Sequence, residues 1–236
     1  MAGKGKRLQP IGFSKELYPV VFKNKHYAIS EFSIRAMERA DVDEIKLVVN
    51  PDKQDIAKYY SNSRKNLSIY FYSSPSLPES CLHPINGLHD NDICVFGLPD
   101  TLFSPGDGYK KIIDHLLKTG SEICLGLFKV PNASKYDSVL FDNNNVVKKV
   151  LVKQNPPCSN YIWGIWGGKV HALKKLAEQI ASQKNAEEKL LGVGFNTLVK
   201  KKLAKITCIV IGANYFDLGT IDAAIQANAV VNKFDF

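Results

Sequence analysis

The sequence has no apolar run close to the ~18 residues that a membrane-spanning helix needs. Its first residues, Met1 to Leu8, are polar and rich in glycine, unlike a secretory signal peptide. We therefore expect a soluble, cytoplasmic protein with no membrane partner.

Metal-binding and disulfide patterns are also missing. The number of cysteines is odd, no two form a CxxC pair, and three of them (Cys94, Cys124 and Cys208) lie in apolar, strand-like runs. Buried, reduced thiols are the expected state. The five histidines show no ligand spacing, and we expect ordinary surface or core residues.

The sequence also lacks an aromatic-interleaved basic patch and zinc-finger spacing. Its formal charge is nonetheless +8, which suits polyanionic ligands. The lysines are scattered except for Lys200 to Lys202, a run that fits the solvated end of a helix. Nucleotides and sugar phosphates are therefore better candidates than nucleic acid, which only the net charge supports.

What is present is an alternation of short apolar runs with segments of helical period. The 236 residues, 45% of them hydrophobic, suffice for one α/β domain. In the first half we expect strands at 45–49, 67–72, 93–98 and 122–130, and helices at 28–40, 54–60 and 109–118. Such an order predicts a Rossmann-like, doubly wound sheet.

The second half begins with antiparallel signals. A hairpin is expected at 138–142 and 146–153, followed by a strand at 161–166, helices at about 169–183 and 187–201, a strand at 206–211 and a helix at 221–231. The predicted fold class is thus α/β, a mixed doubly wound sheet with an antiparallel insertion.

The segment Ala2 to Leu8 carries two glycines, two lysines and Arg7. Glycines let backbone N–H groups approach phosphate oxygens, and basic side chains add charge-assisted hydrogen bonds. The loop is neither a P-loop nor a complete GxGxxG fingerprint, because Leu8 replaces the third glycine. A phosphate-binding loop and a flexible basic tail are both compatible with this segment alone.

Two aspartates follow apolar strands. Asp100 comes after the run 93–98, and Asp217 after 206–211. Ligands gather at the carboxyl ends of strands in open α/β sheets, and two carboxylates with phosphate oxygens and waters form a common Mg²⁺ site. Each aspartate alone is equally compatible with a turn or a helix N-cap.

These motifs together resemble one family. The stretch AGKGKRLQP followed by SKELYPV is similar to the opening of the sugar-1-phosphate nucleotidyltransferases, such as glucose-1-phosphate thymidylyltransferase and uridylyltransferase. Their pattern reads G-x-R-L-x-P and then P-K-x-L-x-P-V, and here Ser14 replaces the first proline. The P-D-T context of Asp100 and the D-x-G-T context of Asp217 also match, so the resemblance spans residues 2 to 228.

The resemblance implies roles on the nucleotide side. The backbone at Ala2, Gly3 and Gly5 would meet the nucleotide, and Arg7 and Lys15 would be the catalytic cations that hold the triphosphate. Asp100 and Asp217 would hold Mg²⁺. In the segment that reads the base, Ser74 is the nucleotide-binding candidate, and dTTP, UTP and CTP stay open.

On the sugar-phosphate side the resemblance is weaker. The candidates there are Tyr136, Lys153, Asn160 and Trp163. The family's glycine has become Asp137 and its glutamate Val152. Trp163 and Trp166 are three apart in an expected strand, so regular alternation predicts that they face opposite sides.

The family's domain plan, applied here, gives a single nucleotidyltransferase domain over 1–236. About 1–130 would form the nucleotide-binding half, about 131–204 the sugar-phosphate insertion, and about 205–236 the return strand and closing helix. The family's glycine loop follows a buried first strand, whereas only Met1 precedes Ala2 here. We therefore hypothesise several apolar residues upstream.

The predicted function is Mg²⁺-dependent transfer of a nucleotidyl group from a nucleoside triphosphate to a sugar 1-phosphate, with pyrophosphate released. A homo-oligomer is possible. Two alternatives stay open. The acceptor could be a non-sugar phosphate, which Asp137 and Val152 motivate. The protein could also be a catalytically silent nucleotide-binding relative, although the retained Arg7, Asp100 and Asp217 argue against this.

Overall fold

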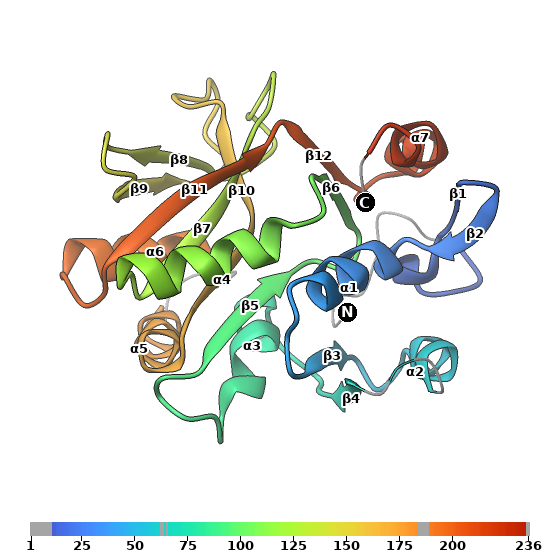
Figure 1. Ribbon diagram of the computed structural model, residues 1–236, viewed down its shortest axis with the longest axis horizontal. Helices are drawn as coiled ribbons and strands as arrows, with labels where there is room; N and C mark the ends of the chain where they lie inside the picture. Colours follow the sequence, from blue (N-terminus) through green and yellow to red (C-terminus); the bar gives the residue numbers. More distant parts are fainter. Residues whose placement is uncertain (1–10, 62–63, 65, 184–188, 235–236) are drawn as a thin grey trace.

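A central mixed sheet organises the carboxyl-terminal half of the chain in the computed structural model, which describes residues 11–61, 64, 66–183 and 189–234. Strand β7 (Ile123–Lys129) lies between β11 (Ile206–Gly212), which is parallel to it, and the antiparallel β10 (Tyr161–Lys169). The far edge of β10 pairs with β5 (Ile93–Gly97) near one end and with the hairpin β8–β9 (Ser138–Phe141 and Val147–Leu151) near the other. Figure 1 shows this arrangement.

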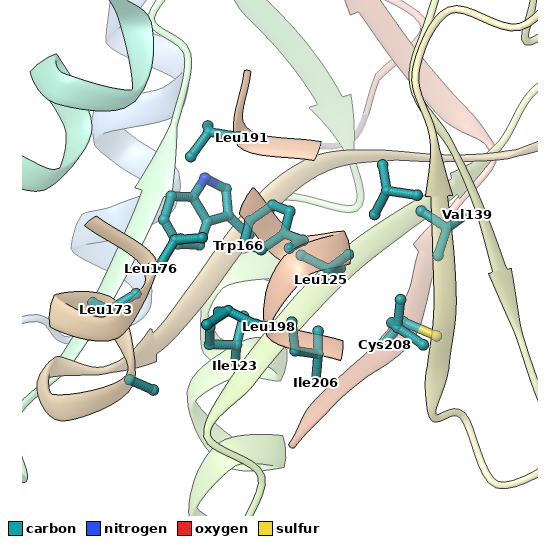
Figure 2. Close-up of a cluster of buried hydrophobic side chains, with 14 of the residues drawn as sticks. Ile123, Leu125, Val139, Trp166, Leu173, Leu176, Leu191, Leu198, Ile206 and Cys208 are labelled. Atoms are coloured by element: carbon teal, nitrogen blue, oxygen red, sulfur yellow. The ribbon is translucent and has the colours of Figure 1, made fainter. Parts of the chain in front are cut away.

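Helices cover both faces of this sheet, as its apolar strands require. Helix α4 (Gly108–Thr119), which ends at the left-handed Gly120, packs Ile112 and Leu116 against one face. Helices α5 (Val170–Ala181) and α6 (Leu191–Lys200) cover the other. In Figure 2, Trp166 lies among Leu173, Leu176 and Leu191 in the core on that side.

A smaller layer stands beside the main sheet. Strands β3 (Ile45–Val49) and β4 (Leu67–Phe71) are parallel to each other. Their apolar residues pack with Ile56 and Tyr60 of α2 (Gln54–Tyr60) and with Ile34 of α1 (Ser30–Arg39). Because α1 also packs on α4, this helix joins the smaller layer to the main sheet.

Five short elements were not predicted. They are the hairpin β1–β2 (Pro19–Phe22 and Lys25–Ala28), helix α3 (Leu77–Leu82), and the antiparallel pair of β6 (Thr101–Ser104) with β12 (Asn214–Asp217). Each has four to six residues, too few to show a hydrophobic period. The hairpin turns through Lys23 and Asn24, both with positive φ, as tight hairpin turns require.

The predicted α/β, doubly wound mixed sheet with an antiparallel insertion is confirmed. Helix α7 (Ile221–Val231), capped by Thr220, closes the fold. The predicted helix at 169–183 starts later, at Val170, because β10 continues to Lys169. Of the helices in the described part of the chain, none has both the length and the apolar character needed to cross a bilayer.

Candidate functional site

Lys15 begins a short 3₁₀ turn, Lys15–Leu17. The residues on either side of it, Ser14 and Glu16, are bonded to side chains at the start of α2. On one side, the backbone N–H and the hydroxyl of Ser14 donate to the two carboxylate oxygens of Asp55, at 2.6 and 2.8 Å. On the other side, Lys53 Nζ donates to both oxygens of Glu16, at 2.7 and 2.9 Å. Glu16 is only 1% exposed, so this is a buried ion pair.

These anchors explain why Ser14 stands where the resembled family has proline. Its φ of −67° is one that proline also adopts, but proline has no N–H to donate to Asp55. Partial burial raises the pKa of Asp55, yet the two bonds from Ser14 outweigh it, so its pKa lies below the ordinary 3.8. Asp55 is therefore a charged acceptor at neutral pH.

Asp100 and Asp217, far apart in the chain, are brought together by the pairing of β6 with β12. Asp217 is directly opposite Thr101 in this ladder, and the N–H of Leu218 donates to the Asp100 carbonyl at 2.9 Å. Asp100 follows β5, and its side chain is nearly buried. Both aspartates are thus brought to the end of the sheet where β5 terminates, and the charges of both act on Lys15.

The Lys15 ammonium forms an ion pair with Asp100 Oδ2. Burial lowers the pKa of Lys15, but the charge and hydrogen bond of Asp100, with the charges of Glu16 and Asp217, more than compensate and raise it above 10.5. Lys15 therefore carries its charge throughout the physiological range, next to both aspartates.

Two tyrosines flank Asp217. The rings of Tyr136 and Tyr215 meet edge to face, with centroids 5.8 Å apart. Burial, then the charge of Asp217, raises the pKa of Tyr136. Burial and the charges of Asp217 and Asp100 raise the pKa of Tyr215 well above 10.0. Both phenols stay neutral near pH 7, so Tyr136 can donate a hydrogen bond beside the carboxylates.

Lys15, Glu16 and the two aspartates open onto one cleft of about 1560 Å³. Of the candidates from the sequence, Lys15, Ser74, Asp100 and Asp217 line it. Ala2, Gly3, Gly5 and Arg7 lie outside the residues that the structure describes. The sequence reasoning missed Glu16, Lys53 and Asp55, because nothing in the local sequence shows that α2 packs on the turn that carries Lys15.

None of the four candidates for the sugar-phosphate side is among the residues that line the cleft. Lys153 is exposed and adopts a positive φ of 41°, Asn160 is exposed, and Tyr136 reaches only the Asp217 end. The Lys153 N–H donates to Asp137 Oδ1 at 3.2 Å. Burial raises the pKa of Asp137, although this bond and the charge of Lys153 partly oppose the shift.

The expectation that Trp163 and Trp166 face opposite sides is wrong. The register of β10 against β7 shifts between Trp163 and Ile165, so Gly164 is the extra residue of a β-bulge. The inserted residue reverses the alternation of the β10 side chains between the two faces of the sheet. Both indoles therefore contact Phe195 edge to face, with ring centroids 5.7 and 5.3 Å away.

Within the described residues, no group of three or more His, Cys, Asp or Glu could hold a metal by itself. The pair of Asp100 and Asp217 offers only carboxylate oxygens, the hard ligands that Mg²⁺ prefers, and leaves the other positions to phosphate and water. The donor set therefore fits Mg²⁺ brought in with a polyphosphate, rather than a permanently bound ion.

The sequence model of the family described as "Nucleotidyl transferase" matches residues 1–233. A bifunctional sugar-1-phosphate nucleotidylyltransferase/acetyltransferase of Sulfurisphaera tokodaii is 24% identical over 163 residues, which are 68% of this chain and 37% of that relative. The chain therefore spans less than half the length of the curated relative.

Solved structures share the fold. A glucose-1-phosphate thymidylyltransferase of Bacillus anthracis, in complex with sucrose, superposes with a TM-score of 0.80 over 99% of this chain and 94% of its own, at 18% identity. A UDP-glucose pyrophosphorylase of Acinetobacter baumannii gives 0.77 over 96% and 89%, at 17% identity. A UTP-bound form of that enzyme type from the same organism gives 0.74 over 97% and 90%, also at 17%.

Proposed function

The chain belongs to the nucleotidyl transferase family, and on that premise we propose that it transfers a nucleotidyl group from a nucleoside triphosphate to a sugar 1-phosphate, releasing pyrophosphate. The observation that carries the proposal is the meeting of Asp100 and Asp217 beside the Lys15 ammonium. The sugar-1-phosphate activity in the name of the Sulfurisphaera tokodaii relative supports the choice of acceptor.

The proposed reaction needs the protein mainly to position the reactants and to stabilise negative charge. A phosphate oxygen of the acceptor attacks the α-phosphorus in line, and the bond to the pyrophosphate oxygen breaks. The acceptor phosphate is already an anion at pH 7, so no side chain needs to remove a proton. Catalysis then depends on holding the reactants in line and on stabilising the charge that develops.

Each residue of the site has a proposed part in this step. Lys15, held by its anchors, would neutralise the α-phosphate, and Arg7 the departing pyrophosphate. Mg²⁺ on Asp100 and Asp217 would supply further positive charge to the α-phosphate oxygens. Ser74 would meet the nucleotide at the cleft wall. Tyr136, Lys153, Asn160 and Trp163 would lie on the acceptor side.

The first prediction tests the two aspartates. We expect Asp100→Asn and Asp217→Asn to reduce Mg²⁺-dependent pyrophosphate release by about 10²-fold or more, because each removes one of two charged ligands. Circular dichroism and the urea midpoint should stay close to the unmodified values. Asp222→Asn is the matched control, since Asp222 is exposed in the first turn of α7 just after Asp217.

The assay should pair dTTP, UTP and CTP with sugar 1-phosphates and with phosphorylated alcohols. Release that requires a sugar 1-phosphate supports the proposal. If pyrophosphate is released only with a phosphorylated alcohol, the acceptor is a non-sugar phosphate. Normal turnover in both aspartate variants would remove the metal assignment.

A further inference from the structure

Lys15 and the proposed metal site depend on the same carboxylate. The Lys15 ammonium forms an ion pair with Oδ2 of Asp100, and Asp217 lies near enough for its charge to act on the same ammonium. Asp100 is only 6% exposed. A carboxylate that is removed from water in this way needs a countercharge, and Lys15 supplies it.

A divalent cation has to compete with Lys15 for this carboxylate. Mg²⁺ binds carboxylate oxygens directly, at about 2.1 Å. An ammonium that is bonded to the same carboxylate repels the cation, because both are positive and a buried position screens their repulsion only weakly. The ion pair of Lys15 with Asp100 therefore lowers the affinity of the two aspartates for a divalent cation.

The neighbouring acid does not draw Lys15 away from Asp100. Both carboxylate oxygens of Glu16 accept hydrogen bonds from Lys53, at 2.7 and 2.9 Å, so the charge of Glu16 is already balanced. The remaining charge near the Lys15 ammonium is that of the two aspartates.

The backbone at Lys15 is anchored, but its ammonium can move. The bonds from Ser14 to Asp55 hold the turn, whereas the lysine side chain is a flexible four-carbon chain with three rotatable donors. The Lys15 side chain is 21% exposed and lines the cleft. A polyanion that enters the cleft can thus take the ammonium from Asp100 without moving the turn.

We propose that Lys15 keeps divalent cations off the metal pair, Asp100 and Asp217, until a nucleoside triphosphate binds. Before that, its ammonium holds Asp100. When the triphosphate binds, the ammonium turns to the phosphate oxygens, and both carboxylates become available to the cation that accompanies the triphosphate. Lys15 thereby couples the binding of the cation to the binding of the triphosphate. The inference rests on the proposed function, because it takes the metal pair as the cation ligands.

The first test measures Mn²⁺ binding without nucleotide, from the electron paramagnetic resonance signal of the free ion. It compares the unmodified chain with Lys15→Met and with the matched control Lys46→Met. Lys46 lines the same cleft and has the same charge, but it pairs with Glu44. We expect Lys15→Met to bind Mn²⁺ about tenfold more tightly than the unmodified chain, and Lys46→Met to differ from it by no more than about twofold.

Two further variants keep the test valid if Lys15→Met does not fold, which circular dichroism checks. In Lys15→Gln the amide can still donate a hydrogen bond to Asp100, but the charge is gone. Its affinity for Mn²⁺ should also rise about tenfold. Lys15→Arg keeps the charge and should bind Mn²⁺ as the unmodified chain does.

The second test adds the non-hydrolysable α,β-methylene analogues of dTTP, UTP and CTP in turn, and subtracts the Mn²⁺ that each analogue binds alone. The analogue should tighten Mn²⁺ binding about tenfold more in the unmodified chain than in Lys15→Gln, because the carboxylates of the variant are already available. An equal effect in both would mean that Lys15 does not couple the two ligands.

Equal Mn²⁺ affinity, or none, in the unmodified chain, Lys15→Met and Lys15→Gln would overturn the inference. An equal rise in Lys46→Met would also overturn it, because the net charge of the cleft would then explain the effect. So would a rise that persists in the double variant Lys15→Met/Asp217→Asn, because the ion would then bind elsewhere. The proposed function fails on a different measurement, the absence of pyrophosphate release from the unmodified chain with every acceptor.

Discussion

At the scale of single residues, the position of Lys15 depends on two side chains, Asp55 and Lys53, that do not line the cleft. Asp55 holds the residue before it, and Lys53 holds the residue after it. Both belong to the start of α2, so the turn cannot move without that helix. The side chain of Lys15 then pairs with Asp100 and is directed into the site.

The buried pair of Glu16 and Lys53 makes this dependence measurable. We expect Lys53→Ala to lower the free energy of unfolding by about 3 kcal/mol, because the mutation leaves the Glu16 carboxylate buried without its countercharge. Urea denaturation at pH 7 is the measurement. Triphosphate binding should also weaken, since the turn that carries Lys15 loses an anchor.

Lys58→Ala is the matched control for this mutation. Lys58 is an exposed lysine in the same helix, and its substitution should change stability by no more than about 0.5 kcal/mol. Equal losses in the two variants would mean that the buried pair contributes nothing specific.

At the scale of elements, the bulge in β10 decides which residues face which layer. Gly164 is the inserted residue, and it lies against an aromatic ring. A Cβ atom there would stand 2.2 Å from Cε2 and 2.8 Å from Cδ2 of Tyr215. Tyr215 belongs to β12, two residues before Asp217, so the bulge also touches the element that carries part of the site.

Gly164→Ala is therefore expected to destabilise the protein by about 1–3 kcal/mol through overpacking against Tyr215. Urea unfolding measures the loss. Gly12→Ala is the control, because a Cβ atom at Gly12 meets no atom within 4 Å. If both alanine variants unfold at the same midpoint, the ring of Tyr215 moves aside freely and the bulge does not require glycine.

At the scale of the whole molecule, the described chain is organised as two parts with the cleft between them. The main sheet has large cores on both faces. The β3–β4 layer has its own smaller core and meets the rest mainly through α1. Both tryptophans of the protein, Trp163 and Trp166, belong to the core of the main sheet.

This division predicts that unfolding is not a single step. In urea, far-UV circular dichroism, which reports on every helix and strand, should begin to change at a lower concentration than tryptophan fluorescence, which reports only on the main sheet. Coincident transitions in the unmodified chain would contradict the division.

The secondary structure was more predictable from the sequence than the tertiary contacts that form the candidate site. The sequence by itself determined most of the longer elements, from the apolar runs of β3, β5 and β7 to the helical period of α4, because burial imposes a period on each segment. It also placed Asp100 and Asp217 after strands. Only the tertiary structure decided that these aspartates meet, since the short β6–β12 pair has no local signal.

The anchors of Lys15 and the facing of the two tryptophans were likewise decided in three dimensions. Asp55 and Lys53 contact residues far away in the chain, and the bulge at Gly164 exists only in the pairing of β10 with β7. The preference of a segment for helix or strand depends on residues that are close together in the sequence. Which distant segments share an edge depends instead on the packing of the whole core, and no short stretch of sequence contains that information.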